Sequence, residues 1–176
     1  MRTSAVLSVN SRERYTHLCP CGYLSEPPHP CTCTPIGIHR YRSRISGPLL
    51  DRIDIHIEVP AVKYRDLADR GEAESSAAIA KRVEHSRELQ LDRYKGTKIH
   101  CNAQMTPRFI KKYCELDASG NRMLELVTDR FGFSARTYTR ILKVARTIAD
   151  LDGSSAIREQ HIAEAIQYRS LDRKTN

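Results

Sequence analysis

The sequence predicts a mainly α-helical protein that also has a partial α/β portion, with one clear strand and a cysteine-rich loop. Apolar residues recur at helical spacing through much of 75–170, whereas a single segment alternates with period two. Aromatic residues make up only 6% of the 176 residues and tryptophan is absent, which favours helices over a β-sandwich. The 40% of apolar and 28% of charged residues are enough to bury a core.

Four of the six cysteines lie close together near the N-terminus, as Cys19-Pro-Cys21 and Cys31-Thr-Cys33. The nine residues between the pairs contain one glycine and three prolines, so they form a loop. Thiolates are soft donors, and four of them suit a tetrahedral zinc ion. The pattern therefore predicts a structural metal site, although Cys-x-Cys pairs are unusual in zinc sites and four free thiols are the alternative. Cys101 and Cys114 are expected to be buried residues of the helical part.

A polar helix is expected over 36–46, and Gly47-Pro48 ends it. The segment Ile53–Val59 then alternates with period two, which places three isoleucines and a valine on one face. This pattern predicts a half-buried strand that ends at Pro60. One strand cannot form a sheet, so its partners must come from the N-terminal residues, another chain or sequence outside this one.

The second half predicts a bundle of four or five helices. Serine, threonine or aspartate precedes most of the expected helices, and glycine follows several of them, as is typical of helix ends. The expected helices run from Ser75 to about Tyr94, from Thr106-Pro107 to Cys114, from Asp117 or Ser119 to Gly132, from Ser134 to Asp152-Gly153, and over about 159–169.

Arg52 lies directly before the start of the expected strand, just after a tight turn. Its planar, permanently charged guanidinium suits phosphate oxygens. The alternative, which spacing alone favours, is a local ion pair with Asp51 or Asp54.

Arg136, Arg140 and Lys143 share one face near the start of the helix capped by Ser134. A helix N-terminus together with arginine is a good site for an anion. The alternative is a solvated charged face. The net charge of +8 permits an anionic partner such as nucleotide or nucleic acid without demonstrating one.

Several segments resemble the C-terminal half of the Mg-chelatase-like AAA+ ATPases of the ComM/YifB type. The resemblance covers about 19–173 and is most specific over 40–60. The segments are CPCGYL (19–24), CTC (31–33), RYRSRISGPLLDRIDIHIEVP (40–60), SARTYTRILKVARTIADL (134–151) and EAIQYR (164–169). It implies an unmatched leader at 1–18, the end of an AAA+ core at 19–72 and a helical lid at 73–176.

The resemblance also implies roles for individual residues. Arg52 corresponds to the arginine finger, which reaches the γ-phosphate bound by an adjacent subunit of a usually hexameric ring. Arg136 corresponds to the sensor-2 arginine of the lid, which contacts nucleotide phosphate. The implied cofactors are ATP and Mg²⁺, and the implied activity is ATP-driven DNA remodelling, namely branch migration during recombination and transformation.

The sequence departs from this family in its first part. The phosphate-loop string Gly-x-x-x-x-Gly-Lys-Ser/Thr does not occur in these 176 residues, nor does the acidic magnesium motif expected before the cysteines. His17 and Leu18 stand where the family has Asn-Pro. We therefore expect that this chain alone does not hydrolyse ATP.

Other functions stay open at this point. A magnesium-chelatase-type metal-insertion subunit belongs to the same ATPase class, whereas a zinc-stabilised DNA-binding or adaptor module and an inert gene remnant do not. No run of about 18 apolar residues occurs and the N-terminus lacks the pattern of a signal peptide. We therefore expect a cytoplasmic protein that does not associate with membranes.

Overall fold

The computed structural model describes residues 17–24, 29–44, 51–57, 59, 62, 64 and 74–169. The chain divides into two compact units. The first contains the cysteine loop and helix α1 (Pro35–Arg42), and the second contains the described residues between 51 and 59 and the helical bundle. In the described part of the chain, no helix has both the length and the apolar content needed to cross a bilayer.

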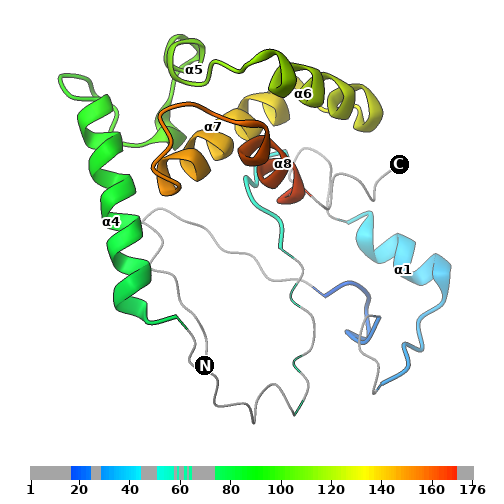
Figure 1. Cartoon of the computed structure of the whole chain (residues 1–176). Helices are drawn as coiled ribbons and strands as arrows, with labels where there is room; N and C mark the ends of the chain where they lie inside the picture. Colours follow the sequence, from blue (N-terminus) through cyan, green and yellow to red (C-terminus); the bar gives the residue numbers. More distant parts are fainter. Residues whose placement is uncertain are drawn as a thin grey trace. The chain divides into compact units, whose positions relative to one another are not determined.

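Helix α7 is the centre of the bundle. It contacts α8, α4, α5 and the short 3₁₀-helix η1, and Figure 1 shows α7 and α8 between α4 and α6. The described part is thus mainly helical, as the sequence predicted. The bounds are α4 (Ser76–Arg93), η1 (Asn102–Gln104), α5 (Pro107–Tyr113), α6 (Ala118–Phe131), α7 (Ala135–Leu151) and α8 (Glu159–Gln167).

Side-chain caps begin three of these helices at the positions that the sequence indicated. Ser75, Asp117 and Ser134 each accept a hydrogen bond from the backbone N–H three residues ahead, which satisfies a donor that the helix leaves unpaired. Thr106 precedes Pro107 at the start of α5 as predicted, but its side chain makes no capping hydrogen bond.

Gly132 ends α6 in the left-handed conformation, with φ at 62°. We expect Gly132→Ala to destabilise the protein by about 1–2 kcal/mol, because a β-carbon is strained in this conformation. Urea unfolding followed by circular dichroism measures the change, and Gly132→Asn is the matched variant because asparagine tolerates the conformation better. Equal stability of the alanine variant and the wild type would contradict this account of the α6 end.

The hydrophobic core lies where α7 packs against its neighbours. Ile141, Leu142, Ala145 and Ala149 form the buried stripe of α7, and Ile162 and Ile166 of α8 pack against it. The spacing of these residues along α7 is the helical period that the sequence showed. The core is completed by Tyr94, Met105, Cys114, Leu124, Ile157 and Ala165.

Helix α4 packs through polar side chains as well as apolar ones. Val83 is 41% exposed, whereas Ser86 and Gln90 are buried. The Gln90 side-chain carbonyl accepts a hydrogen bond of 3.0 Å from the backbone N–H of Asn102, and its amide donates to Ser86. These bonds satisfy polar groups that are otherwise costly to bury.

A buried ion network joins α4 to α7 around Asp150, whose side chain is fully buried. The Asp150 carboxylate accepts hydrogen bonds of 2.5 and 2.6 Å from Arg93 and one of 3.0 Å from Arg146. Asn102 donates a further hydrogen bond of 2.8 Å. The hydrogen bond to Asp150 raises the pKa of Arg93, so the Arg93 guanidinium keeps its charge beside this carboxylate.

The prediction of a strand at 53–59 is wrong for the residues of this segment that the structure describes. Among its described residues, His56 forms an isolated parallel bridge with Arg169, and no strand neighbour extends the pairing. The expected burial is also reversed: His56 is 5% exposed, whereas the apolar side chains of Ile57 and Val59 are 68% and 83% exposed. An isoleucine face is buried only when a sheet or helix covers it, and no described element covers this one.

Candidate functional site

The segment that carries Arg52 is attached to the N-terminal end of α7. Ser134 caps this helix, and its hydroxyl donates a hydrogen bond of 3.3 Å to the Asp51 carboxylate. The Thr137 hydroxyl donates a second, of 3.0 Å, to the other carboxylate oxygen. The anion at the start of α7 is thus Asp51, where the helix dipole and its hydroxyl groups favour negative charge.

Contacts farther along the same segment hold it against α7 and α8. Asp54 forms an ion pair with Arg140, and the guanidinium of Arg169 donates to the backbone carbonyl of Ile53. The backbone N–H of His56 donates a hydrogen bond of 2.7 Å to the carbonyl of Tyr168. Arg169 itself is only 1% exposed, so the guanidinium that holds Ile53 is buried.

Arg52 and Arg136 are both exposed at this junction. The residues on either side of Arg52, Asp51 and Ile53, are held to the bundle by hydrogen bonds. Asp51 contacts Ser134 and Thr137. Arg136 lies between these two residues in the sequence. The structure therefore attaches the segment that contains Arg52 to the helix turn that contains Arg136, 84 positions away in the sequence.

The three basic residues that the sequence placed on one face near the start of α7, Arg136, Arg140 and Lys143, do not form one solvated face. Arg136 is exposed, whereas Arg140 and Lys143 are partly buried. Arg140 is paired with Asp54, and Lys143 donates a hydrogen bond of 2.8 Å to the carbonyl of Ala103. Burial lowers the pKa of both side chains. Of the three, only Arg136 presents an exposed side chain to a ligand.

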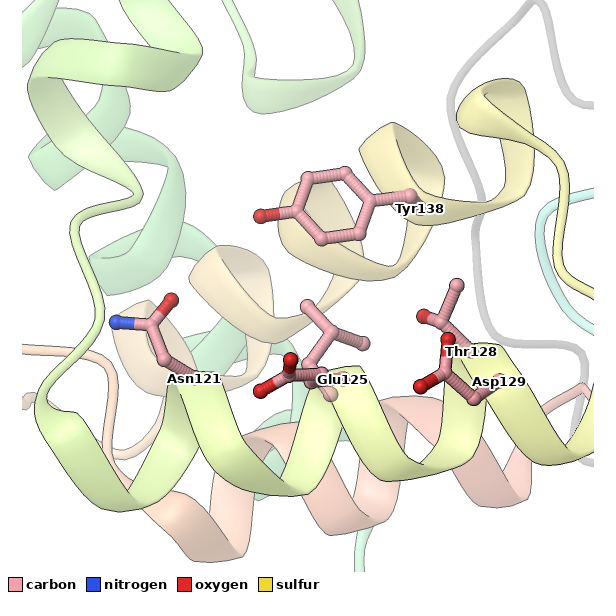
Figure 2. A pocket seen from close by; sticks show the side chains of 6 residues that line it. Asn121, Glu125, Thr128, Asp129 and Tyr138 are labelled. Carbon is pink, nitrogen blue, oxygen red and sulfur yellow. The ribbon is translucent and has the colours of Figure 1, made fainter.

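A pocket of about 340 Å³ lies between α6 and the first turns of α7. Figure 2 shows Tyr138 of α7 facing Asn121 and Glu125 of α6 across it. Two carboxylates, those of Glu125 and Asp129, line the pocket, and its lining includes no basic residue. This charge does not suit a nucleotide phosphate, so the pocket is a poor candidate for the ATP site.

In the first unit, the predicted cysteine ligands lie together. The Sγ atom of Cys19 is 3.4 Å from that of Cys21 and 3.7 Å from that of Cys31, and Cys21 and Cys31 are 3.5 Å apart. With Cys33 included, the four sulfurs lie within 4.8 Å of one another. No described cysteine is in a disulfide.

Local backbone geometry explains how the two pairs meet. Gly22 has a φ of 87°, and its N–H donates to the carbonyl of Cys19 at 3.1 Å, which closes a tight turn around the first pair. Thr34, directly after the second pair, caps α1, which begins at Pro35 and not Ile36 as predicted. The helix was predicted to continue to residue 46, but α1 ends at Arg42 with Ser43 as its C-cap. Residues 45 and 46 lie outside the described residues.

The thiols influence one another. The hydrogen bond from the Tyr23 backbone lowers the pKa of Cys21 to about 6, which favours a thiolate there. The backbone of Cys33 lowers the pKa of Cys31, but burial and the neighbouring Cys21 sulfur outweigh this effect and the pKa is raised. A second negative charge is thus disfavoured while no cation lies between the sulfurs.

The sequence did not indicate the residues that hold the Arg52 segment in place. Asp51 was considered only as a partner for Arg52, and neither Thr137 nor Arg169 was singled out. One signal was available in the sequence. These residues lie in segments that resemble the Mg-chelatase-like AAA+ ATPases, namely 40–60, 134–151 and 164–169.

Two family models match this chain. Residues 73–169 match the family described as magnesium chelatase, subunit ChlI C-terminal, and residues 14–67 match magnesium chelatase, subunit ChlI. Protein YifB of Salmonella typhimurium is 42% identical over 142 residues, and competence protein ComM of Haemophilus influenzae is 42% identical over 141 residues. A protein of Mycobacterium tuberculosis is 27% identical over 151 residues, which are 86% of this chain and 29% of that protein.

The YifB and ComM matches each cover 80% of this chain but only 27% of the relative. The chain therefore spans about a quarter of the length of these curated relatives. The C-terminal family match alone extends over more than half of the chain and coincides with the helical bundle. On this evidence, the chain belongs to the magnesium chelatase family and corresponds to a fragment of the YifB and ComM proteins.

Proposed function

We propose that this chain supplies two arginines, Arg52 and Arg136, to an ATP-Mg²⁺ site on an adjacent subunit in a ring of AAA+ ATPase subunits. Arg52 is the arginine finger that stabilises charge on the transferred phosphoryl group. Arg136 is the sensor-2 residue of the lid and binds nucleotide phosphate. In the assembled ATPase, hydrolysis drives DNA remodelling of the branch-migration type.

The observation that carries this proposal is the junction between Asp51 and the start of α7. Its hydrogen bonds to Ser134 and Thr137 attach the Arg52 segment to the first turn that contains Arg136. Both arginines are exposed, as residues that contact the nucleotide of an adjacent subunit must be. Permanent charge and several donors per side chain suit them to phosphate oxygens. A role in DNA uptake is supported by one relative, which is named a competence protein.

The test is a complementation experiment in a chimera, with the phosphate-loop half of Haemophilus influenzae ComM joined to residues 14–176 of this chain. One variant loses the phosphate-loop lysine, and the other carries Arg52→Ala. Each is expected to be inactive alone, but a mixture is expected to regain part of its ATP turnover. In mixed rings, an intact Arg52 meets an intact phosphate loop across a subunit interface. If the unmodified chimera turns over ATP but the mixture does not, Arg52 does not act between subunits.

The unmodified chain is expected to show no ATP turnover above background, because its sequence contains no phosphate loop to hold the β- and γ-phosphates. A phosphate-release assay on the pure chain measures this. Turnover that Arg136→Ala abolishes would contradict the expectation. Arg87→Ala, an exposed change on α4, is the matched control.

A zinc-stabilised DNA-binding or adaptor module is the second candidate, and the cysteine cluster with the net charge of +8 favours it. It predicts DNA binding by the isolated chain without nucleotide, which weakens steeply with salt because phosphate neutralisation releases counterions. The lid function predicts weak DNA binding by the isolated chain. Fluorescence anisotropy at two salt concentrations separates the two.

A further inference from the structure

We propose that Cys19, Cys21, Cys31 and Cys33 bind one zinc ion in a closed, structural site. This inference is independent of the ATPase proposal, because it concerns the first compact unit and requires neither nucleotide nor a neighbouring subunit. It rests on the positions of the sulfurs, on the turn that places them and on how little apolar core the described residues of this unit have.

The spacing of the sulfurs fits a tetrahedral ion. Four thiolates at about 2.3 Å from zinc form a tetrahedron whose edges are about 3.8 Å long. The observed separations among Cys19, Cys21 and Cys31 are 3.4, 3.5 and 3.7 Å, and Cys33 lies within 4.8 Å of the other three. These distances far exceed a disulfide bond of about 2.05 Å. The sulfurs are therefore arranged around a common centre and are not paired by covalent bonds.

The donor set selects the metal. Four cysteine sulfurs without oxygen or nitrogen donors suit zinc, whereas magnesium and calcium require oxygen ligands. All four tetrahedral positions are filled by protein, so no position is left for a water molecule or substrate, and the ion has a structural role. Binding converts four thiols to thiolates and releases their protons, and the ion offsets the mutual repulsion of the sulfurs.

The first unit needs such an ion because its described residues contain little apolar core. Within the described residues 17–24 and 29–44, Cys19 is the one buried residue, with 0% exposure. Helix α1 buries none of its residues. Ile36 of α1 is 81% exposed. Small segments without a core are held by metals or disulfides. The ion would join the Gly22 turn to the start of α1, and the hydrogen bond of 3.0 Å from Arg42 to the carbonyl of Leu18 closes the same unit.

The first measurement is metal content. The full chain is produced in cells grown with added zinc, and the purified protein is analysed for zinc and iron by elemental mass spectrometry. We expect one equivalent of zinc per chain in the wild type and in Cys101→Ser, the control outside the cluster. We expect Cys19→Ser and Cys33→Ser to lose most of it. Iron in place of zinc, a wild type without zinc, or equal loss in the Cys101→Ser control would overturn the proposal.

A second measurement remains informative if the serine variants fold poorly. Cobalt(II) is added to the metal-free wild type, and we expect the thiolate-to-metal charge-transfer and intense visible bands of tetrahedral cobalt. Weak octahedral bands would contradict a four-sulfur site. Hydrogen exchange on the same samples tests the structural role: metal removal is expected to lower protection in α1 while α7 and α8 keep theirs. Unchanged protection in α1 would refute that role.

Discussion

Asp150→Ala is expected to destabilise the bundle by about 3–5 kcal/mol, which is the effect of removing one partner from a buried ion network. The substitution leaves the guanidinium of Arg146, only 2% exposed, and that of Arg93 without the carboxylate that balances their charges. It also removes an acceptor for Asn102. Urea unfolding of the purified chain, followed by far-ultraviolet circular dichroism, measures the loss.

Asp92→Ala is the matched control, because Asp92 is an exposed aspartate near the end of α4. It is expected to change the free energy of unfolding by no more than about 0.5 kcal/mol. Asp150→Asn retains the shape of the side chain but not its charge, and should fall between the two. A cost below about 1 kcal/mol for Asp150→Ala would show that water reaches the network and screens it.

Arg52→Ala in the ComM chimera is expected to lower the rate of ATP turnover by about 10³-fold or more, the usual effect of losing an arginine finger. Nucleotide affinity should change much less, because the finger acts mainly on charge that develops during phosphoryl transfer. Turnover assays give the rate, and binding of a fluorescent ATP analogue gives the affinity.

Arg52→Lys separates charge from shape. Lysine keeps the positive charge but lacks the planar fork, so it should restore only a small part of the rate. Arg136→Ala is expected to weaken nucleotide affinity together with turnover, because sensor 2 contacts bound phosphate. Arg87→Ala should leave both quantities unchanged. If Arg52→Ala retained wild-type turnover, the finger would have to be another residue.

Local sequence signals were sufficient for most of the helices. Ser134 before an apolar stripe predicted the start of α7, and Gly132 predicted the end of α6, because capping depends on residues within one turn. The cysteine cluster was also predictable from sequence, since two Cys-x-Cys pairs flank one short loop. Its turn at Gly22 and the separations of its sulfurs required coordinates.

The prediction for Ile53–Val59 was wrong about the strand pairing and about which side chains are buried. Both errors have the same cause. Alternation shows which residues share a face of a strand, but not what covers that face. With no covering element among the described residues, Ile57 and Val59 are exposed and His56 faces the C-terminal end of α8. Burial of a strand is decided by its partners, which this segment does not encode.

The sequence alone determined the helical class, most helix ends of the bundle and the cysteine cluster, because periodicity, caps and motif spacing act over short distances. Only the tertiary structure decided that Asp51 occupies the start of α7, 83 residues from Ser134, and that Asp150 joins α7 to Arg93 across 57 positions. Such pairings depend on how helices pack. An ionic partner at that separation has no local signature, since any residue of opposite charge elsewhere in the chain could serve as well.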